Sequence, residues 1–461
     1  MSAVLPLLRV NKCFRSVCPF TLTLSPEYRS EGIESFAKPT AIPALRPALG
    51  RFFIALAVAC LLQQNALAEW SRFRGANGAG VQDKCNVPLP WQAEDVAWQI
   101  ELPGKGNGSP IVQGGKVFIM SADPVSAERY ALAYDLQTGQ ELWRKATESQ
   151  THKLHARSSY ASCTPCANAE AVYFAWASPE SLTIRSFSHT GEELWSKDLN
   201  RYISAHGFGG SPILVDDKLI LANSQDAEEL PEGVAPGDSS VVALEAKTGN
   251  IAWETPRTSV RTSYGAPTVV VAENGRKTLL FSETGEGLFA LDALTGKQLW
   301  NKKVFVKRCV SCPVVVGDLV IGTEGSGGGG NILFAVNMKG DHEVVFQVPR
   351  AAPYVPTPVA KGDLLFMWAD NGIVSCVETP SGETVWSERV GGNVSSSPVI
   401  AGDKLMGIAE DGTITILSAT RDFKEFGTVK LGETVRSTPL LSEDYLIVRT
   451  DSKLICVGKP K

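Results

Sequence analysis

The sequence predicts an all-β fold: an eight-bladed β-propeller of four-stranded antiparallel blades, closed by an N-terminal strand. Three observations predict it. A sequence pattern recurs with a period of about 40–55 residues, which is typical of propeller blades. The pattern starts eight times. One ending without a start of its own lies near the N-terminus, where it can complete the last blade.

Every copy starts with a small residue followed by proline. The eight starts are Ser109-Pro110, Thr164-Pro165, Ser211-Pro212, Ala266-Pro267, Cys312-Pro313, Thr357-Pro358, Ser397-Pro398 and Thr438-Pro439. The first four copies end in Thr-Gly and a tryptophan, such as Thr138-Gly139 with Trp143, and the later endings are looser. The last copy has no ending, whereas Val96-Ala97-Trp98 forms an ending before the first start. A strand around Trp98 is therefore expected to pair with the C-terminal blade, which leaves no open sheet edge.

The third copy shows why a repeat forms a blade. Residues 211–215 predict the innermost strand, with proline at a position that need not donate a ladder hydrogen bond. Residues 218–221 and 241–245 predict the second and third strands. Gly249 suits a turn that needs a positive φ. Trp253, in the outer strand, is expected to pack in the wedge between neighbouring blades, which widens away from the axis.

The first 68 residues are expected to lie outside this fold, as an N-terminal extension and a signal peptide. Arg51 precedes an apolar run at 52–62, and Ala66-Leu67-Ala68 forms a small-residue cleavage site, as in secretory signals. The run is too short to span a bilayer. We expect a head segment at 69–94, the propeller at 95–461, and a protein exported to the periplasm or cell envelope. Whether it is released or held at a membrane stays open.

Charge excludes some partners. The net charge of −5 becomes −9 when the leader's seven basic and three acidic residues are removed. An acidic chain without a basic block predicts no nucleic-acid partner.

Seven cysteines follow the leader, including the spacings Cys163-Thr-Pro-Cys166 and Cys309-Val-Ser-Cys312. Both pairs fall at first strands of blades, where residues three apart face opposite ways. Buried structural cysteines are the favoured interpretation, with a redox pair or a metal site as alternatives. No metal site is predicted, because His152 and His155 lie in an expected loop without a third ligand. The glycine run 325–330 lacks the lysine and helix of a phosphate loop, and is expected to allow close backbone approach to a blade or a ligand.

The segments before the innermost strands form loops around one mouth of a propeller's channel. They contain several arginines, aromatic residues and amides, which suit an anionic or polar ligand such as a peptide or a sugar. We predict a ligand-binding rim formed by Arg157, Tyr160, His206, Arg261, Tyr264, Arg308, Tyr354, Asn393 and Arg436, with Asn107 and Phe208 beside them. The alternative is that each arginine pairs with a local acid or carbonyl and only fixes its loop. No catalytic residue is predicted.

The repeat resembles the propeller repeat of pyrroloquinoline-quinone (PQQ) proteins, most clearly in the run from Ala290 to Trp300, which contains Ala-Leu-Asp, Thr-Gly and Trp. The head, from Trp70 to Gly80, resembles one on exported propellers of planctomycete bacteria. The resemblance implies a superfamily that contains quinoprotein dehydrogenases and the non-enzymatic BamB propeller of outer-membrane protein assembly. The sequence lacks the adjacent cysteines and the haem motif of the dehydrogenases, and their calcium ligands are not recognisable.

The favoured function is therefore an exported, non-enzymatic scaffold, similar to BamB, that binds a protein or an envelope polymer and needs no cofactor. One alternative is a quinone-dependent oxidoreductase that binds PQQ with calcium at an altered site. Another is a polysaccharide or glycopeptide binder.

Overall fold

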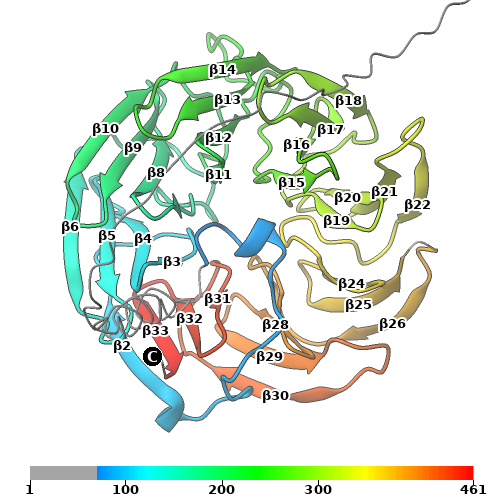
Figure 1. The fold of residues 1–461 in the computed structure, drawn as a ribbon. Helices are drawn as coiled ribbons and strands as arrows, with labels where there is room; N and C mark the ends of the chain where they lie inside the picture. Colours follow the sequence, from blue (N-terminus) through cyan, green and yellow to red (C-terminus); the bar gives the residue numbers. More distant parts are fainter. Residues whose placement is uncertain (1–69, 380, 460–461) are drawn as a thin grey trace, which may run out of the picture. The chain divides into compact units, whose positions relative to one another are not determined.

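The computed structural model describes residues 70–379 and 381–459, and these form eight sheets arranged around a central axis (Figure 1). Each sheet contains four strands in antiparallel order, and one sheet gains a fifth strand, β1 (Val81–Gln82), from the head. The prediction of an all-β, eight-bladed propeller is confirmed. No helix in the described part of the chain is long and apolar enough to cross a membrane. The predicted signal peptide lies outside the described residues.

Blades are numbered here in chain order, from the innermost strand outward. Blades 1 to 4 consist of β3 (Ile111–Gln113), β4 (Lys116–Ala122), β5 (Arg129–Asp135) and β6 (Glu141–Thr147); β7 (Cys166–Ala167), β8 (Ala171–Ala177), β9 (Leu182–Ser188) and β10 (Glu193–Asp198); β11 (Ile213–Val215), β12 (Lys218–Asn223), β13 (Ser240–Glu245) and β14 (Ile251–Pro256); and β15 (Thr268–Val271), β16 (Lys277–Glu283), β17 (Gly287–Asp292) and β18 (Gln298–Lys302). Blades 5 to 8 consist of β19 (Val314–Val316), β20 (Leu319–Glu324), β21 (Ile332–Asn337) and β22 (Val344–Val348); β23 (Val359–Lys361), β24 (Leu364–Trp368), β25 (Ile373–Glu378) and β26 (Thr384–Arg389); β27 (Val399–Ala401), β28 (Lys404–Ile408), β29 (Thr413–Ser418) and β30 (Glu425–Lys430); and β31 (Leu440–Leu441), β32 (Tyr445–Arg449), β33 (Lys453–Gly458) and β2 (Val96–Glu101).

The ring closes in blade 8, which takes its outer strand from the N-terminal side of the chain. Strand β2 pairs antiparallel with β33, and Trp98 lies opposite Cys456. The prediction that the segment around Trp98 completes the last blade is confirmed. The closed ring leaves neither terminal blade with an unpaired third strand.

The repeated tryptophans lie between neighbouring blades, as predicted, and five of them donate a hydrogen bond to the next blade. The indole Nε1 of Trp195, in blade 2, donates to the Ala246 carbonyl of blade 3 at 2.9 Å. Trp98, Trp143, Trp253 and Trp386 donate in the same way to the following blade. Gly249 has φ +72°, and a Cβ there would lie 2.6 Å from Trp195. The glycine of Thr-Gly is therefore required both by the turn and by the neighbouring indole.

The small residues before the prolines form a hydrogen-bonded inner ring around the channel. The backbone N–H of each donates to the side chain of its counterpart in the next blade, for example Thr164 to Ser211 Oγ at 3.0 Å. Seven such bonds of 2.9–3.2 Å run around the eight blades. The N–H of Ser211 lacks this acceptor because blade 4 has Ala266. The recurring small polar residue thus has a structural reason that the sequence analysis did not identify.

The buried cysteines fit this architecture. All seven described cysteines are free thiols, and all but Cys85 are buried. Cys312 takes a serine's place in the inner ring and accepts the N–H of Ala266 at 3.2 Å. Burial raises the pKa of Cys163 to about 12, so this thiol stays protonated and unreactive at neutral pH. The prediction of buried structural cysteines is confirmed for these six.

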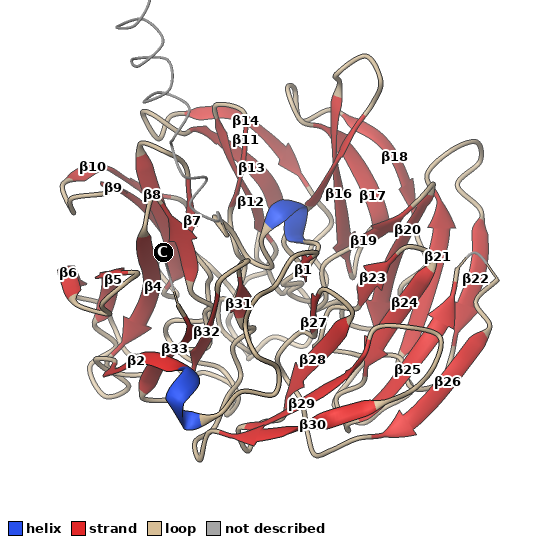
Figure 2. Cartoon of the chain, turned by 60° about the horizontal axis from the view of Figure 1, so that its bottom comes forward, coloured by secondary structure: helices blue, strands red, loops and turns tan. Residues whose placement is uncertain are grey.

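The head crosses the channel and closes one end of it. Its 3-10 helix η1 (Ala76–Gly78) lies at the centre of the ring in both views, whereas η2 (Ala93–Asp95) lies at the edge beside β2 (Figure 1, Figure 2). Trp70 exchanges backbone hydrogen bonds with Val112 of blade 1, and β1 pairs parallel with β27 of blade 7. The segment therefore joins innermost strands on different sides of the ring.

Two buried head arginines fill the axis. Arg74 donates to the carbonyls of Thr357, Pro358 and Pro398 at 2.9–3.1 Å, and Arg72 donates to the Pro267 carbonyl at 2.7 Å. Burial lowers the pKa of both guanidinium groups to about 10. Both remain charged at neutral pH, and within the described residues their hydrogen-bond acceptors are backbone carbonyls.

Candidate functional site

A cavity of about 1060 Å³ lies at the N-terminal ends of the innermost strands, whereas the head pairs near their other ends. Two kinds of loop form it: those that enter the innermost strands and those that connect second to third strands. Both kinds lie on one face because neighbouring strands are antiparallel. The cavity therefore has an open mouth and a floor near the plugged axis.

Most of the predicted rim residues line this one cavity. The structure brings together Arg157, His206, Arg261, Tyr264, Arg308, Tyr354, Asn393 and Arg436, with Asn107 and Phe208 beside them. Tyr160 is not among the lining residues. Its hydroxyl bonds both backbone groups of His152, and its ring lies 4.7 Å from the Arg129 guanidinium carbon. Tyr160 thus helps to hold its own loop.

Sequence reasoning missed several lining residues. The glycine run 325–330, for which a blade or a ligand contact was open, lines the cavity, as do Arg350, Asp370 and Asn371. A signal was present for the acids, because Glu324 ends a second strand, and Asp226, Asp370 and Glu410 each follow one by no more than three residues. Such positions face the same mouth as the entry loops.

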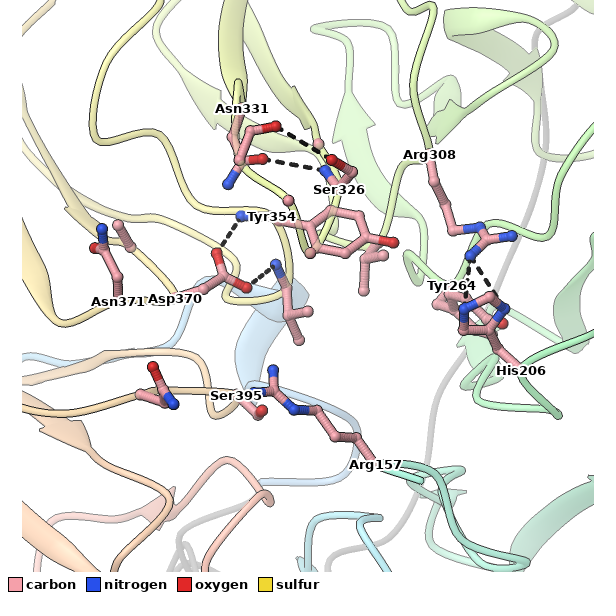
Figure 3. Close-up of a pocket in the computed structure, with 18 of the residues that line it drawn as sticks. Arg157, His206, Tyr264, Arg308, Ser326, Asn331, Tyr354, Asp370, Asn371 and Ser395 are labelled. Carbon is pink, nitrogen blue, oxygen red and sulfur yellow. Dashed lines mark hydrogen bonds between the residues drawn. The ribbon is translucent and has the colours of Figure 1, made fainter. Parts of the chain in front are cut away.

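These acids hold the rim loops through backbone amides. Asp370 accepts the N–H groups of Tyr354 and Val355 at 2.6 and 3.0 Å, as Figure 3 shows. Asp226 accepts the N–H groups of Ala205 and Thr262 at 2.7 and 2.5 Å. Burial nevertheless raises the pKa of Asp370, since desolvation outweighs its amide bonds. The acids therefore act first as loop anchors.

The rim arginines have only partial partners. Arg157 and Arg436 share Glu410 at 3.8 and 3.7 Å, and Arg308 lies 3.9 Å from Asp226. All three separations exceed hydrogen-bond length. Arg261 pairs closely with Glu229. The local pairing considered as the alternative from sequence is thus present, but in three of four cases without a direct hydrogen bond to the acid.

Arg308 and His206 form one corner of the cavity (Figure 3), and His155 lies beside them. Arg308 Nη1 lies 3.0 Å from both ring nitrogens of His206, and the His206 ring stacks on His155 with 4.8 Å between centroids. Burial, then the Arg308 charge and His155, lower the pKa of His206 to about 4. His206 is therefore neutral at pH 7 and adds no positive charge beside Arg308.

The residues present do not fit the calcium ion that the quinoprotein resemblance implies. Within residues 70–379 and 381–459, no group of three or more His, Cys, Asp or Glu side chains could hold a metal. The oxygens of Asp370 and Asp226 are engaged by backbone N–H groups. The nearest cations are guanidinium groups, which would repel a divalent metal ion.

Comparisons of the sequence with known proteins are consistent with this architecture. A family model described as outer membrane protein assembly factor BamB matches residues 91–177, 183–351 and 344–457. Polyvinylalcohol dehydrogenase of Pseudomonas sp. is 25% identical over 340 residues, covering 63% of this chain and 50% of that protein. BamB of Burkholderia pseudomallei is 26% identical over 111 residues, covering 22% of this chain and 26% of that protein. The chain thus spans half or less of these curated relatives.

Solved structures show the same fold. A europium-containing methanol dehydrogenase superposes with a TM-score of 0.64 at 12% identity, covering 87% of this chain and 100% of that one. The family model covers more than half of the sequence, and the fold is that of a BamB-like and PQQ-dehydrogenase-like propeller. The chain therefore belongs to the outer membrane protein assembly factor BamB family.

Proposed function

We propose that this protein is an exported, non-enzymatic propeller that binds a protein or an envelope polymer in its arginine-lined cavity. One observation carries the proposal. Five arginines line the cavity with a single acid, Asp370, whose two oxygens already accept backbone amides. Such a surface attracts anionic groups, and its loops are fixed in place by buried acids rather than left to move. A preformed site on a rigid disc is suited to binding.

Export and a place in the periplasm or cell envelope are part of this proposal. The apolar run at 52–62 and the Ala-Leu-Ala site support them. The name of the family, which refers to outer-membrane protein assembly, is consistent with that location.

A quinone-dependent oxidoreductase is the second candidate, and the match to polyvinylalcohol dehydrogenase favours it. The acids near the cavity speak against a calcium-assisted quinone, because backbone amides occupy them. The arginines alone would still attract an anionic quinone.

The two candidates are separated by titration calorimetry of the purified exported chain with PQQ, with and without calcium, together with a dye-reduction assay on alcohols and sugars. The scaffold proposal expects no dye reduction under any condition. It also expects envelope fractions to contain a ligand that binds the wild type and an Arg144→Gln control, but binds Arg308→Gln at least tenfold more weakly. Arg144 lies on the outer strand β6, far from the cavity lining. Quinone-dependent dye reduction would overturn the proposal.

A further inference from the structure

Amides and hydroxyls recur in the neutral part of the cavity lining, beside glycines and small apolar residues. Four asparagines and four serines line it: Asn107, Asn331, Asn371, Asn393, Ser158, Ser162, Ser326 and Ser395. The aliphatic side chains are small or few, with Val310 and Val355 as the largest. A peptide anchored by apolar side chains would find little to bury here. A ligand with many hydroxyl groups would find donors and acceptors among them, although the side chains of Asn107, Asn331, Ser326 and Ser395 already bond protein groups.

Flat aromatic surfaces accompany these groups. Tyr264, Tyr354 and Phe208 line the same cavity, and the first two flank the Arg308 corner (Figure 3). Aromatic faces beside amides suit sugar rings, whose C–H faces pack on the rings while their hydroxyls bond the amides.

The arginines of the lining indicate that the ligand carries a negative charge. Arg350 lines the cavity and makes no hydrogen bond or ion pair within the described residues. Arg308 faces a neutral histidine instead of a direct carboxylate partner, and its Nε is buried without a hydrogen bond. Guanidinium groups bind carboxylates and sulfates through paired N–H donors. An anionic group in this corner would complete the partners of Arg308.

The shape limits how the ligand enters. The head arginines Arg72 and Arg74 fill the axis, so a polymer cannot pass through the ring. A volume of about 1060 Å³ accommodates a few sugar units, because drug-sized ligands occupy pockets of roughly 300–1,000 Å³. The site therefore suits the end or a short branch of a chain.

We propose that the cavity binds a short acidic oligosaccharide, with its carboxylates or sulfates at Arg308 and Arg350 and its sugar rings on Tyr264 and Tyr354. This inference rests on the proposed binding function and names its ligand class. Carboxylated and sulfated sugars present the same anionic chemistry, and the experiment separates them.

The test is calorimetric titration of the full exported chain with tri-galacturonate, a sulfated trisaccharide, a neutral trisaccharide of the same linkage and a tetra-glutamate peptide. At least one anionic sugar is expected to bind at least tenfold more tightly than the neutral sugar and the peptide. The stronger of the two anionic sugars identifies the charged group. Affinity is expected to fall as salt rises, because exposed charges are screened.

Arg350→Gln is the discriminating variant, since Arg350 has no partner within the described chain and its loss should leave folding intact. It should weaken the anionic sugar by about tenfold or more. Arg144→Gln should leave binding unchanged. Equal binding of neutral and anionic sugars, tighter binding of the peptide, or an unaffected Arg350→Gln variant would each overturn the inference. If no sugar binds while an envelope protein still binds through Arg308, the ligand class fails and the binding function stands. Quinone-dependent dye reduction would instead remove the function itself.

Discussion

Replacing Ala266 by serine should stabilise the propeller by completing the inner ring. In seven of eight blade pairs, a hydroxyl or thiol at this position accepts the N–H of the preceding blade at 2.9–3.2 Å. The missing link is from Ser211 to Ala266. A serine at 266 would place its hydroxyl where Ser211 and Ser397 already have one.

Whether Ala266→Ser stabilises or destabilises the fold tests the role of the inner ring. One intramolecular hydrogen bond contributes about 0.5–1.5 kcal/mol, and a buried donor left unpaired costs about 1–3 kcal/mol. Ala266 is 2% exposed, so an added hydroxyl that found no partner would destabilise the fold. If the ring argument holds, Ala266→Ser raises the free energy of unfolding by about 1 kcal/mol.

The assay is equilibrium guanidinium unfolding followed by tryptophan fluorescence, with the transition midpoint compared at unchanged slope. The reciprocal variant Cys312→Ala removes the acceptor of the Ala266 N–H and should cost about 1–3 kcal/mol. Cys312→Ser retains an acceptor and should cost less. A destabilised Ala266→Ser protein, or equal stabilities of the two Cys312 variants, would refute the role given to the ring.

Three further predictions concern the turns, the plug and the rim. Gly249→Ala should lower the free energy of unfolding by about 2–4 kcal/mol, because its Cβ would meet Trp195 at 2.6 Å. Gly340→Ala is the control: with φ +64° and no atom within 4 Å of the added Cβ, it should cost only about 1 kcal/mol. Equal losses of the two variants in chemical unfolding would contradict the role of the indole contact. Arg74→Met should cost about 3 kcal/mol or more in the same assay, since it leaves the carbonyls of Thr357, Pro358 and Pro398 without a donor, whereas Arg276→Met at the surface should change little. The pKa of His206 is lowered to about 4 in the folded state, so the unfolded chain binds more protons between pH 6.5 and 4, and stability should fall as pH drops through that window. His206→Asn should flatten this part of the profile of unfolding free energy against pH. An unchanged profile would contradict the burial of His206 beside Arg308.

The architecture was predictable from the repeat because a similar sequence pattern recurs in every blade. Trp98 could be assigned to the last blade since it was an ending without a start, and its pairing with Cys456 confirms the inference. The rim arginines were predictable for a related reason: each lies in an entry loop, and all entry loops meet at one mouth.

Other features depend on contacts that leave no local signal. Tyr160 shares a loop with Arg157, yet it turns toward Arg129 of the preceding blade. Arg74 bonds carbonyls 283 to 324 residues away, and a carbonyl is present at every residue whatever the side chain. The role of the head therefore could not be predicted from sequence.

The plugged axis has a consequence for biosynthesis. The head and β2 are synthesised before the other strands of the ring, but some of their partners, in blades 6, 7 and 8, are made last. Until then the head can pair with blades 1 and 2, but Arg74 lacks its carbonyl acceptors in blades 6 and 7. Contacts of such long sequence separation form slowly. Folding should accordingly finish only after the last blades have been synthesised, when the head docks into the closed ring.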